Sequence, residues 1–332
     1  MKKVFEYLNN DREAFTKNKQ NEAVSLVDPE TKKVSLDLVN RVKCPICNVD
    51  NANWCFEKEG FDFVKCRHCG LLYVNPQLKT DVTESFYKNS KTAEAWIGLQ
   101  KNKKEQEWNF INKYKPALEC ISKIKPKGGR LLDIGCSIGQ FIYESKQYGW
   151  QPEGIELNHD AAEIARKEYG QTVYEEKLEN LELAEKSYDL ITLWGVLEHL
   201  TDPNDMLQKV YKYLKDDGLV LSFVPNAHSM IVRMTRNYNS TVSGLAHLWY
   251  FSPKTIDKFY IKNGFRKVME FSVLPQVHEI QHFLQYNILY KEPNMLCDEE
   301  LVFQEEERSV ITNLINRNKM GYKLITIAKK VL

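Results

Sequence analysis

The stretch LLDIGCSIGQF, residues 131–141, constrains the fold of this chain more than any other feature. It opens with a short apolar run, Leu131 to Ile134, that suits a buried parallel strand and includes an acidic residue, Asp133. Small residues then fill the turn: Gly135, Ser137 and Gly139. Backbone in such a turn can approach a ligand closely. The pattern predicts the strand, turn and helix with which an α/β protein holds a nucleoside cofactor, although the spacing differs from the Gly-x-Gly-x-x-Gly of NAD-binding domains.

The segments that follow continue the alternation of strands and helices. Helix-like IGQFIYESKQYG leads to WQPEGIEL, a strand ending in Glu156 about twenty residues after the turn, where a carboxylate can accept both ribose hydroxyls. Asn158 opens a helix, AAEIARKEYG, which closes at Gly170. Further strands are YDLITLWG, from Tyr188 to Gly195, and LVLSFVPN after Gly218. This order predicts an α/β protein with a doubly wound, parallel sheet.

Three more blocks extend the pattern: YDLITLWGVLEHLTDP, LKDDGLVLSFVPN and HLWYFSPKTIDKFYIKNGF. Together with the first turn they resemble the class I S-adenosylmethionine (SAM)-dependent methyltransferases. The resemblance covers roughly residues 125–274, with KLITIAKK near the C-terminus as the final strand. It implies a seven-stranded, mostly parallel Rossmann-like sheet whose closing strands run antiparallel to the rest.

The resemblance also implies which residues bind SAM. It assigns the glycine turn to the methionine end of the cofactor, Glu156 to the ribose, and Leu178 or Glu179 to the adenine edge. The residues expected at the cofactor are Asp133, Gly135, Cys136, Ser137, Gly139, Glu156, Leu157, Leu178, Glu179 and Trp194. Ser137 replaces a commoner glycine, and we expect a negative φ there. The alternative is a sheet that binds nothing, with ordinary turn and strand-end residues at these positions.

Two Cys-x-x-Cys pairs, CPIC and CRHC, lie upstream of the sheet. Their separation suits one structural Zn²⁺ held by four thiolates: Cys44, Cys47, Cys66 and Cys69. So short a segment cannot bury a sufficient core without the metal. The alternatives are a disulfide pair, a redox site, or His68 in place of one cysteine. The other cysteines are expected to be lone thiols: Cys55, Cys120, Cys136 and Cys297.

Methyl transfer requires aligned reactants and a base that uncovers the nucleophile. His199 is the first candidate for this base, because it follows a strand at the carboxyl edge of the sheet, and Glu198 beside it is expected to orient the ring. The alternative is that both residues only cap the next helix. In ubiquinone-pathway O-methyltransferases a Glu-x-x-Glu-His block can hold a divalent metal. Gly195 replaces the first glutamate here, so we expect no catalytic metal.

His247, in GLAHLWYFS, is the second candidate. The block is similar to one in zinc-containing sugar C-methyltransferases, where Tyr-x-Glu-His lies near the sugar. Gly244 and Ala246 stand at the positions of that tyrosine and glutamate, which weakens the C-methylation interpretation. Tyr250 and Ser252 are expected to line the pocket or to serve in packing.

The chain of 332 residues, with a net charge of +1, is long enough for a main domain and appendages. We expect four parts: an extension at 1–40, a zinc-binding module at 41–80, a helical lid at 81–124, and a SAM-binding domain at 125–332 with a helical insertion at about 276–320. No apolar run approaches the ~18 residues of a membrane span, and the N-terminus is too polar for a secretion signal. A cytoplasmic protein is therefore expected.

The resemblance to bacterial enzymes of sugar and glycan pathways implies a small polar acceptor, such as a nucleotide-linked sugar or a cell-surface glycan precursor, methylated at a hydroxyl. The late helical insertion is expected to shape either the substrate pocket or the contact of a homodimer. Two alternatives stay open: an RNA methyltransferase that grips nucleic acid with the zinc module, and a non-catalytic scaffold. The near-neutral charge argues against the first.

Overall fold

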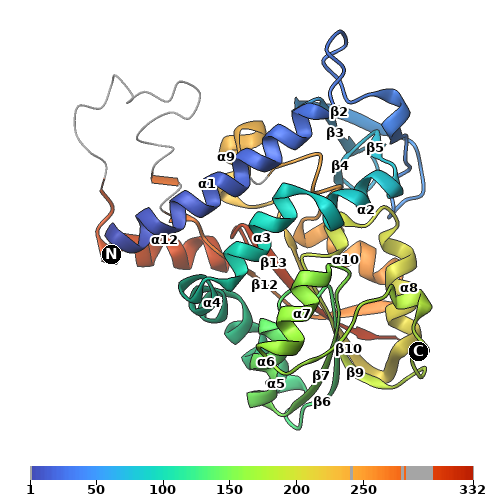
Figure 1. Ribbon diagram of the computed structural model, residues 1–332, viewed down its shortest axis with the longest axis vertical. Helices are drawn as coiled ribbons and strands as arrows, with labels where there is room; N and C mark the ends of the chain where they lie inside the picture. Colours follow the sequence, from blue (N-terminus) through green and yellow to red (C-terminus); the bar gives the residue numbers. More distant parts are fainter. Residues whose placement is uncertain (1, 240–241, 278–279, 282–301, 332) are drawn as a thin grey trace.

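The computed structural model describes residues 2–239, 242–277, 280–281 and 302–331. A layered α/β body forms one end of the molecule, and a small β-module lies at the other end (Figure 1). The long helix α1 (Lys2–Ser25) crosses between them and reaches the module.

The body is built on a seven-stranded sheet with the order β12-β13-β10-β9-β6-β7-β8. Its strands are β6 (Gly129–Ile134), β7 (Trp150–Ile155), β8 (Thr172–Tyr174), β9 (Tyr188–Trp194), β10 (Leu214–Pro225), β12 (Phe265–Val273) and β13 (Lys323–Lys330). The neighbouring strands β10, β9, β6, β7 and β8 all pair in parallel, which confirms the predicted fold class. The expected reversal of the closing strands is wrong for β12. Only β13 is reversed, because it pairs antiparallel with both β10 and β12.

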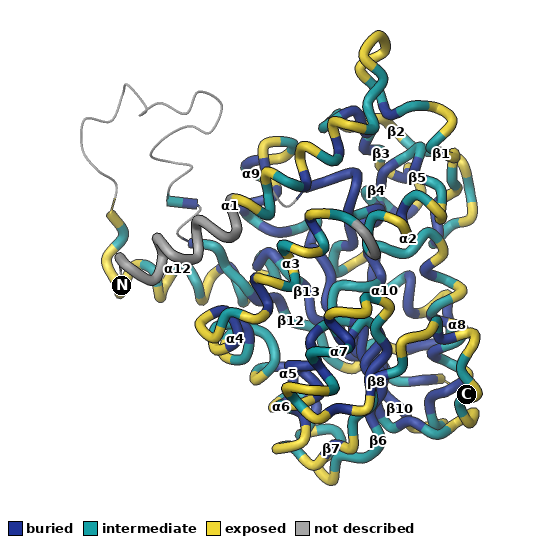
Figure 2. Tube along the Cα trace, in the orientation of Figure 1, coloured by how far each residue is buried: buried dark blue, intermediate teal, exposed yellow. Residues whose placement is uncertain are grey.

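Adjacent residues of each central strand are buried on opposite faces of this sheet. Leu132 and Ile191 belong to one apolar cluster, whereas Leu131 and Leu190 belong to another. Strand side chains alternate in direction, so the apolar runs of β6 and β9 supply both faces at once. Figure 2 shows the buried trace concentrated along these strands.

Helices cover both faces of the sheet. They are α5 (Lys115–Ile124), α6 (Gln140–Ser145), α7 (His159–Lys167), α8 (Pro203–Tyr213) and α10 (Pro253–Lys262). Three of them begin at side-chain caps: Asn158 accepts from Ala161 N, Asp202 from Asn204 N, and Ser252 from Thr255 N. Asn158 thus opens the helix that the sequence predicts. The short β8 has no counterpart among the predicted strands.

The cysteine pairs lie in the β-module, whose main sheet has the order β11-β4-β3-β2. The strands are β2 (Ala52–Lys58), β3 (Phe61–Cys66), β4 (Leu72–Val74) and β11 (Trp249–Tyr250). A second pair joins β1 (Val39–Asn40) to β5 (Gln77–Leu78). One module strand, β11, therefore comes from the C-terminal half of the chain.

Helices also occupy the region where the lid is expected: α2 (Thr80–Asn89), α3 (Lys91–Lys101), α4 (Lys103–Asn109), the π-helical turn η2 (Phe110–Tyr114) and α5. Helix α1 lies beside α3 (Figure 1). After β10 come α9 (Met230–Thr235) and, later, α12 (Glu305–Arg317). The rest of the predicted insertion, including Cys297, falls at 282–301 and lies outside the described residues.

Across the described ranges, every helix is too short or too polar to cross a bilayer.

Candidate cofactor and acceptor site

The turn after β6 has three residues in the left-handed region: Gly135, Ser137 and Gly139, with φ of 75°, 50° and 83°. The expectation of a negative φ at Ser137 is therefore wrong. A left-handed serine costs about 1–2 kcal/mol. Its N–H donates to Glu156 Oε2 at 2.9 Å, and this bond helps to hold the strained turn against the end of β7.

Glu156 lies directly after β7 and supports two backbone segments. Its Oε2 accepts from Ser137 N, and its Oε1 accepts from Asn158 N at 2.8 Å. Burial raises the pKa of this carboxyl. A carboxylate oxygen has more than one acceptor direction, so Glu156 can still receive hydroxyl donors from a ligand.

Asp133 lies near the end of β6, and its Oδ1 accepts from Thr192 Oγ1 at 2.6 Å. Burial, together with the negative charge of Glu156, raises the pKa of Asp133 to about 8. Two carboxylates that are costly to ionise together suit a cationic ligand group, because a positive charge beside them stabilises both. SAM carries such charges, and the two carboxylates fit its cationic groups.

Trp194 at the end of β9 sits among aromatic rings. Its centroid is 5.0 Å from Tyr114, 4.9 Å from Phe141 and 5.2 Å from Phe223. Its indole Nε1 is buried without a hydrogen-bond partner among the described residues. A buried donor of this kind fits a ligand that supplies an acceptor.

The other residues predicted to bind the cofactor do not form one cluster. Cys136 is buried in the turn. Its Sγ lies beside Gly154, where an added Cβ would be only 2.5 Å from the sulfur. Leu157 follows Glu156 and is 39% exposed. Leu178 is buried in the core, while Glu179 pairs with Lys209 at 3.3 Å. The adenine assignment of the last two stays a prediction.

A second cluster, Glu198, His199 and His247, lies where the chain continues beyond β9. Glu198 and His199 are on the short helical turn η5 (Leu197–His199), and the His199 and His247 rings are 4.9 Å apart. Ligand-capable atoms of all three side chains lie within 4.8 Å of one another. The structure thus brings the three predicted catalytic residues together. The alternative capping role is wrong, since Asp202 caps α8.

His199 is held in one tautomer by its neighbours. Its Nδ1 contacts the carbonyl oxygen of Ala246, and the Tyr87 hydroxyl lies 2.5 Å from the same nitrogen while donating to that carbonyl at 2.8 Å. A carbonyl can only accept, so Nδ1 carries the proton and Nε2 is the basic nitrogen of the neutral ring. Burial lowers the pKa of His199, which keeps the ring neutral at physiological pH.

Glu198 and Lys323 connect this cluster to the cofactor edge. Glu198 Oε1 lies 4.0 Å from His199 Nε2 and 3.3 Å from Lys323 Nζ. The Lys323 ammonium is also 5.1 Å from the centroid of Phe223, the ring that neighbours Trp194. The two clusters therefore form one continuous region along the carboxyl edge of the sheet, where ligands of open α/β sheets bind.

The same three side chains could ligate a divalent ion, but Glu198 Oε1 already pairs with the Lys323 ammonium at 3.3 Å. This favours use of the cluster for proton transfer, and the expected lack of a catalytic metal stays a prediction. Sequence reasoning missed Tyr87 and Lys323. Both come from distant segments and bear no local motif.

The GLAH block departs from the sugar C-methyltransferase pattern for a steric reason. A Cβ on Gly244 would lie 2.2 Å from the Phe61 ring of β3, so no tyrosine fits there. The Tyr250 hydroxyl accepts a hydrogen bond from Ser243 N at 2.8 Å, and Ser252 caps α10. These two residues serve the local structure.

The four cysteines of the module converge as predicted. Their Sγ atoms lie within 4.8 Å of one another, with Cys44 and Cys69 3.5 Å apart, and they form no disulfide. Asn48 N donates to Cys44 O, and Gly70 N to Cys66 O, which makes a tight turn of each pair. A tetrahedral thiolate site fits this set. His68 is outside the cluster and lies 3.4 Å from Asn51.

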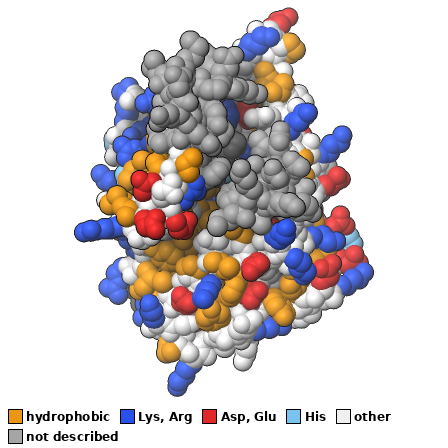
Figure 3. Space-filling model, turned by 90° about the vertical axis from the view of Figure 1, so that its left-hand side faces the viewer, with side chains coloured by type: hydrophobic (Ala, Val, Ile, Leu, Met, Phe, Trp, Pro, Cys, Tyr) orange, Lys and Arg blue, Asp and Glu red, His pale blue; other side chains and the backbone are white. Residues whose placement is uncertain are grey.

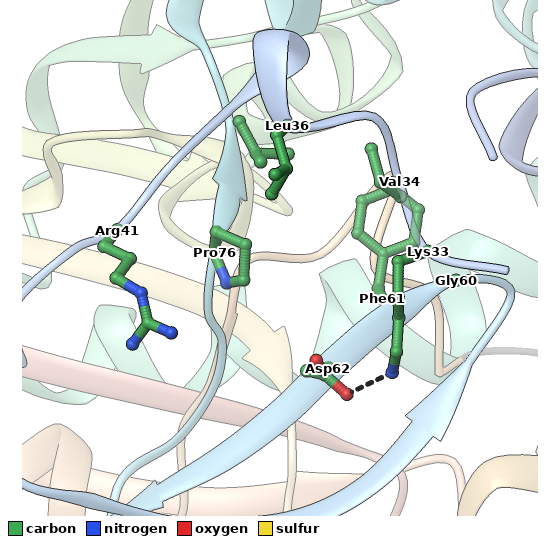
Figure 4. A pocket seen from close by; sticks show the side chains of 9 residues that line it. Lys33, Val34, Leu36, Arg41, Gly60, Phe61, Asp62 and Pro76 are labelled. Atoms are coloured by element: carbon green, nitrogen blue, oxygen red, sulfur yellow. Dashed lines mark hydrogen bonds and ion pairs between the residues drawn. The ribbon is translucent and has the colours of Figure 1, made fainter. Parts of the chain in front are cut away.

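A separate pocket lies on the module, lined by residues of the 33–41 segment and β3 (Figure 4). Lys33 and Asp62 point toward one another there, and Lys33 Nζ donates to Asp62 Oδ1 at 2.7 Å. None of the predicted site residues lines this pocket.

Comparison with known proteins agrees with this geometry. A family model described as a methyltransferase domain matches residues 106–270. A ubiquinone biosynthesis O-methyltransferase of Actinobacillus pleuropneumoniae is 32% identical over 143 residues, covering 40% of this chain and 58% of that protein. The namesake from Burkholderia vietnamiensis is 31% identical over 133 residues, covering 38% and 55%. The chain thus spans less than two thirds of these relatives.

Among solved structures, the phosphoethanolamine N-methyltransferase 2 of Haemonchus contortus, in complex with SAM, superposes with a TM-score of 0.50. The sequence identity is 19%, and the match covers 82% of this chain and 64% of that chain. This similarity therefore shows the fold alone. The matched model and the order of strands in the sheet identify residues 106–270 as a methyltransferase domain with the fold of the class I SAM-dependent methyltransferases.

Proposed function

We propose that the protein transfers a methyl group from SAM to a hydroxyl of a small polar acceptor, such as a nucleotide-linked sugar or a glycan precursor. The observation that supports this most directly is the cluster of Glu198, His199 and His247 beside the cofactor edge. A neutral, oriented imidazole is a suitable base for a hydroxyl proton.

SAM, when bound, supplies an electrophilic methyl group. Glu156 would hold its ribose, and Asp133 with the glycine turn its methionine end. The protein's own part is proton transfer and orientation. His199 Nε2 takes the proton of the acceptor hydroxyl, while Nδ1 keeps its hydrogen bond to Ala246 O. Glu198 then stabilises the imidazolium that forms. His247 lines the same region and positions the acceptor.

We further propose that the four thiolates hold a structural Zn²⁺. The chemistry of the donor set and its burial support this, since Cys44, Cys66 and Cys69 are buried. Reduced thiols of this kind suit a reducing compartment such as the cytoplasm.

A nucleic acid acceptor is less well supported. On the face shown in Figure 3, basic and acidic side chains are interspersed over the part that is coloured. An RNA-binding surface requires a patch of basic side chains.

Incubation with SAM that carries a trideuterated methyl group tests the proposal. Acceptors come from a bacterial small-molecule extract and, separately, from an RNA fraction. We expect the heavy methyl in a sugar-containing metabolite by mass spectrometry. Label in RNA alone would contradict the proposed acceptor class.

A further inference from the structure

The side chains that helix α4 buries are all polar. They are Glu105, Gln106 and Asn109, which are 3%, 9% and 0% exposed. A helix of a globular protein normally buries an apolar stripe, because polar groups that leave water must find new hydrogen-bond partners. The buried polar face of α4 therefore indicates a polar structure or a polar ligand opposite it.

This face lies against the start of α6, which directly follows the glycine turn. Gln140 is the first residue of α6, and its Nε2 donates to Gln106 O at 2.6 Å. Asn109 is three positions beyond Gln106 and so lies on the same side of α4. The chain continues into the π-helical turn η2, where the Tyr114 ring is 5.0 Å from Trp194. Such turns are rare and often occur at functional sites. Helix α4 and η2 thus border the region assigned to the methionine end of SAM.

Asn109 presents a buried donor in this region. Its Oδ1 accepts from Lys113 Nζ, and an ammonium can only donate, so this contact fixes which end of the amide is the oxygen. Asn109 Nδ2 and Trp194 Nε1 are both buried without a hydrogen-bond partner among the described residues. Lys113 Nζ is 5.8 Å from the centroid of Phe223, and that ring is 5.2 Å from Trp194. Two such N–H groups in one region suit a ligand with an acceptor, and a carboxylate can receive both.

We propose that Asn109 and Trp194 donate hydrogen bonds to the carboxylate at the methionine end of SAM. This carboxylate is the one anionic group of SAM, whereas Asp133 suits its cationic groups. The inference rests on the proposed function and extends the cofactor site to α4, in the region expected to be a lid. Both nitrogens are closed to water in this structure, so the carboxylate reaches them when neighbouring side chains move aside.

Calorimetric titration of the protein with SAM and with decarboxylated SAM, which lacks this carboxylate, tests the proposal without turnover. We expect the wild type to bind SAM about tenfold or more tightly than decarboxylated SAM, as the loss of hydrogen bonds to a charged group implies. Equal affinity for the two ligands would overturn the proposal and leave the proposed methyl donor in place. Failure of both ligands to bind would count against the proposed function as well.

Asn109→Asp keeps an oxygen for Lys113 and replaces only the Nδ2 donor. It should abolish the preference for SAM, because a carboxylate there repels the carboxylate of the ligand. Trp194→Phe retains an aromatic ring without Nε1 and should weaken SAM binding while decarboxylated SAM binds as before. Asn112→Ala is the matched control, since Asn112 lies on η2 and its Nδ2 donates to Trp108 O at 2.9 Å.

A preference retained in both Asn109→Asp and Trp194→Phe would contradict the assignment. If a variant fails to fold, the wild-type comparison of the two ligands still decides.

Discussion

His199 owes its proposed role to contacts from outside its own segment. Ala246 O fixes the proton on Nδ1, and the Tyr87 hydroxyl of α2 contacts both that nitrogen and that oxygen. Glu198, the adjacent residue, faces the free nitrogen at 4.0 Å. This is an arrangement in which a neutral ring is oriented for proton abstraction and its charged form is then stabilised.

His199→Ala should lower kcat by about 10²–10⁴-fold with SAM affinity retained, as expected for loss of a general base. In the wild type, the neutral ring is the active form and its pKa lies below the ordinary 6.5. The kcat should therefore rise with pH along a limb centred below 6.5 and level off above it. His159→Ala, on the surface with a 68% exposed side chain, is the control. Full activity of His199→Ala would remove this base.

At the residue scale, the sequence identified the groups that belong to a local motif. Asp133 and Glu156 follow from their spacing to the glycine turn. The φ of Ser137 could not be deduced, because the bond that holds it comes from Glu156, nineteen positions away. Tyr87 and Lys323 were missed for a similar reason, since only the tertiary fold brings them to His199 and Glu198.

At the scale of elements, the four-cysteine β-module is joined to the segment that carries His247. Strand β11 pairs with β4, and Val74 N donates to Leu248 O at 3.0 Å. Leu248 N in turn donates to Glu198 O at 2.7 Å. The backbone next to His247 is therefore held between the module and η5.

Removal of the metal should consequently impair catalysis. Cys44→Ser should reduce zinc content, measured by mass spectrometry of the metal, and lower kcat at least about tenfold, because His247 loses its support. SAM binding, which we assign to other residues at this edge, should change little. Cys55→Ser is the matched control, since Cys55 is exposed. A metal-free variant with full kcat would show that the module does not position this loop.

The elements themselves were predictable where the sequence pattern is local. β6, β9, β10 and β13 contain apolar runs, β7 lies within the strand expected at WQPEGIEL, and Asn158 marks the start of α7. The pairing of β11 with the module was not predictable, because two residues form the strand and its partner lies far away in sequence. The direction of β12 likewise depends on tertiary pairing.

At the scale of the whole molecule, the two halves of the site lie on one edge. We assign Asp133, Glu156 and Trp194 to the proposed cofactor half, and Glu198, His199 and His247 to the proposed acceptor half. Phe223 lies between them, 5.2 Å from Trp194 and 5.1 Å from the Lys323 ammonium. Cofactor binding and catalysis are therefore expected to depend on different residues.

Equilibrium binding of SAM to the wild type, Glu156→Ala and the double variant His199→Ala/His247→Ala tests this account most directly. We expect one SAM per chain in the wild type and in the double variant. Glu156→Ala should bind at least about tenfold more weakly, since hydrogen bonds to a charged group are lost. Absence of SAM binding to the wild type, or unchanged affinity in Glu156→Ala, would contradict the assignment of this edge as the cofactor site.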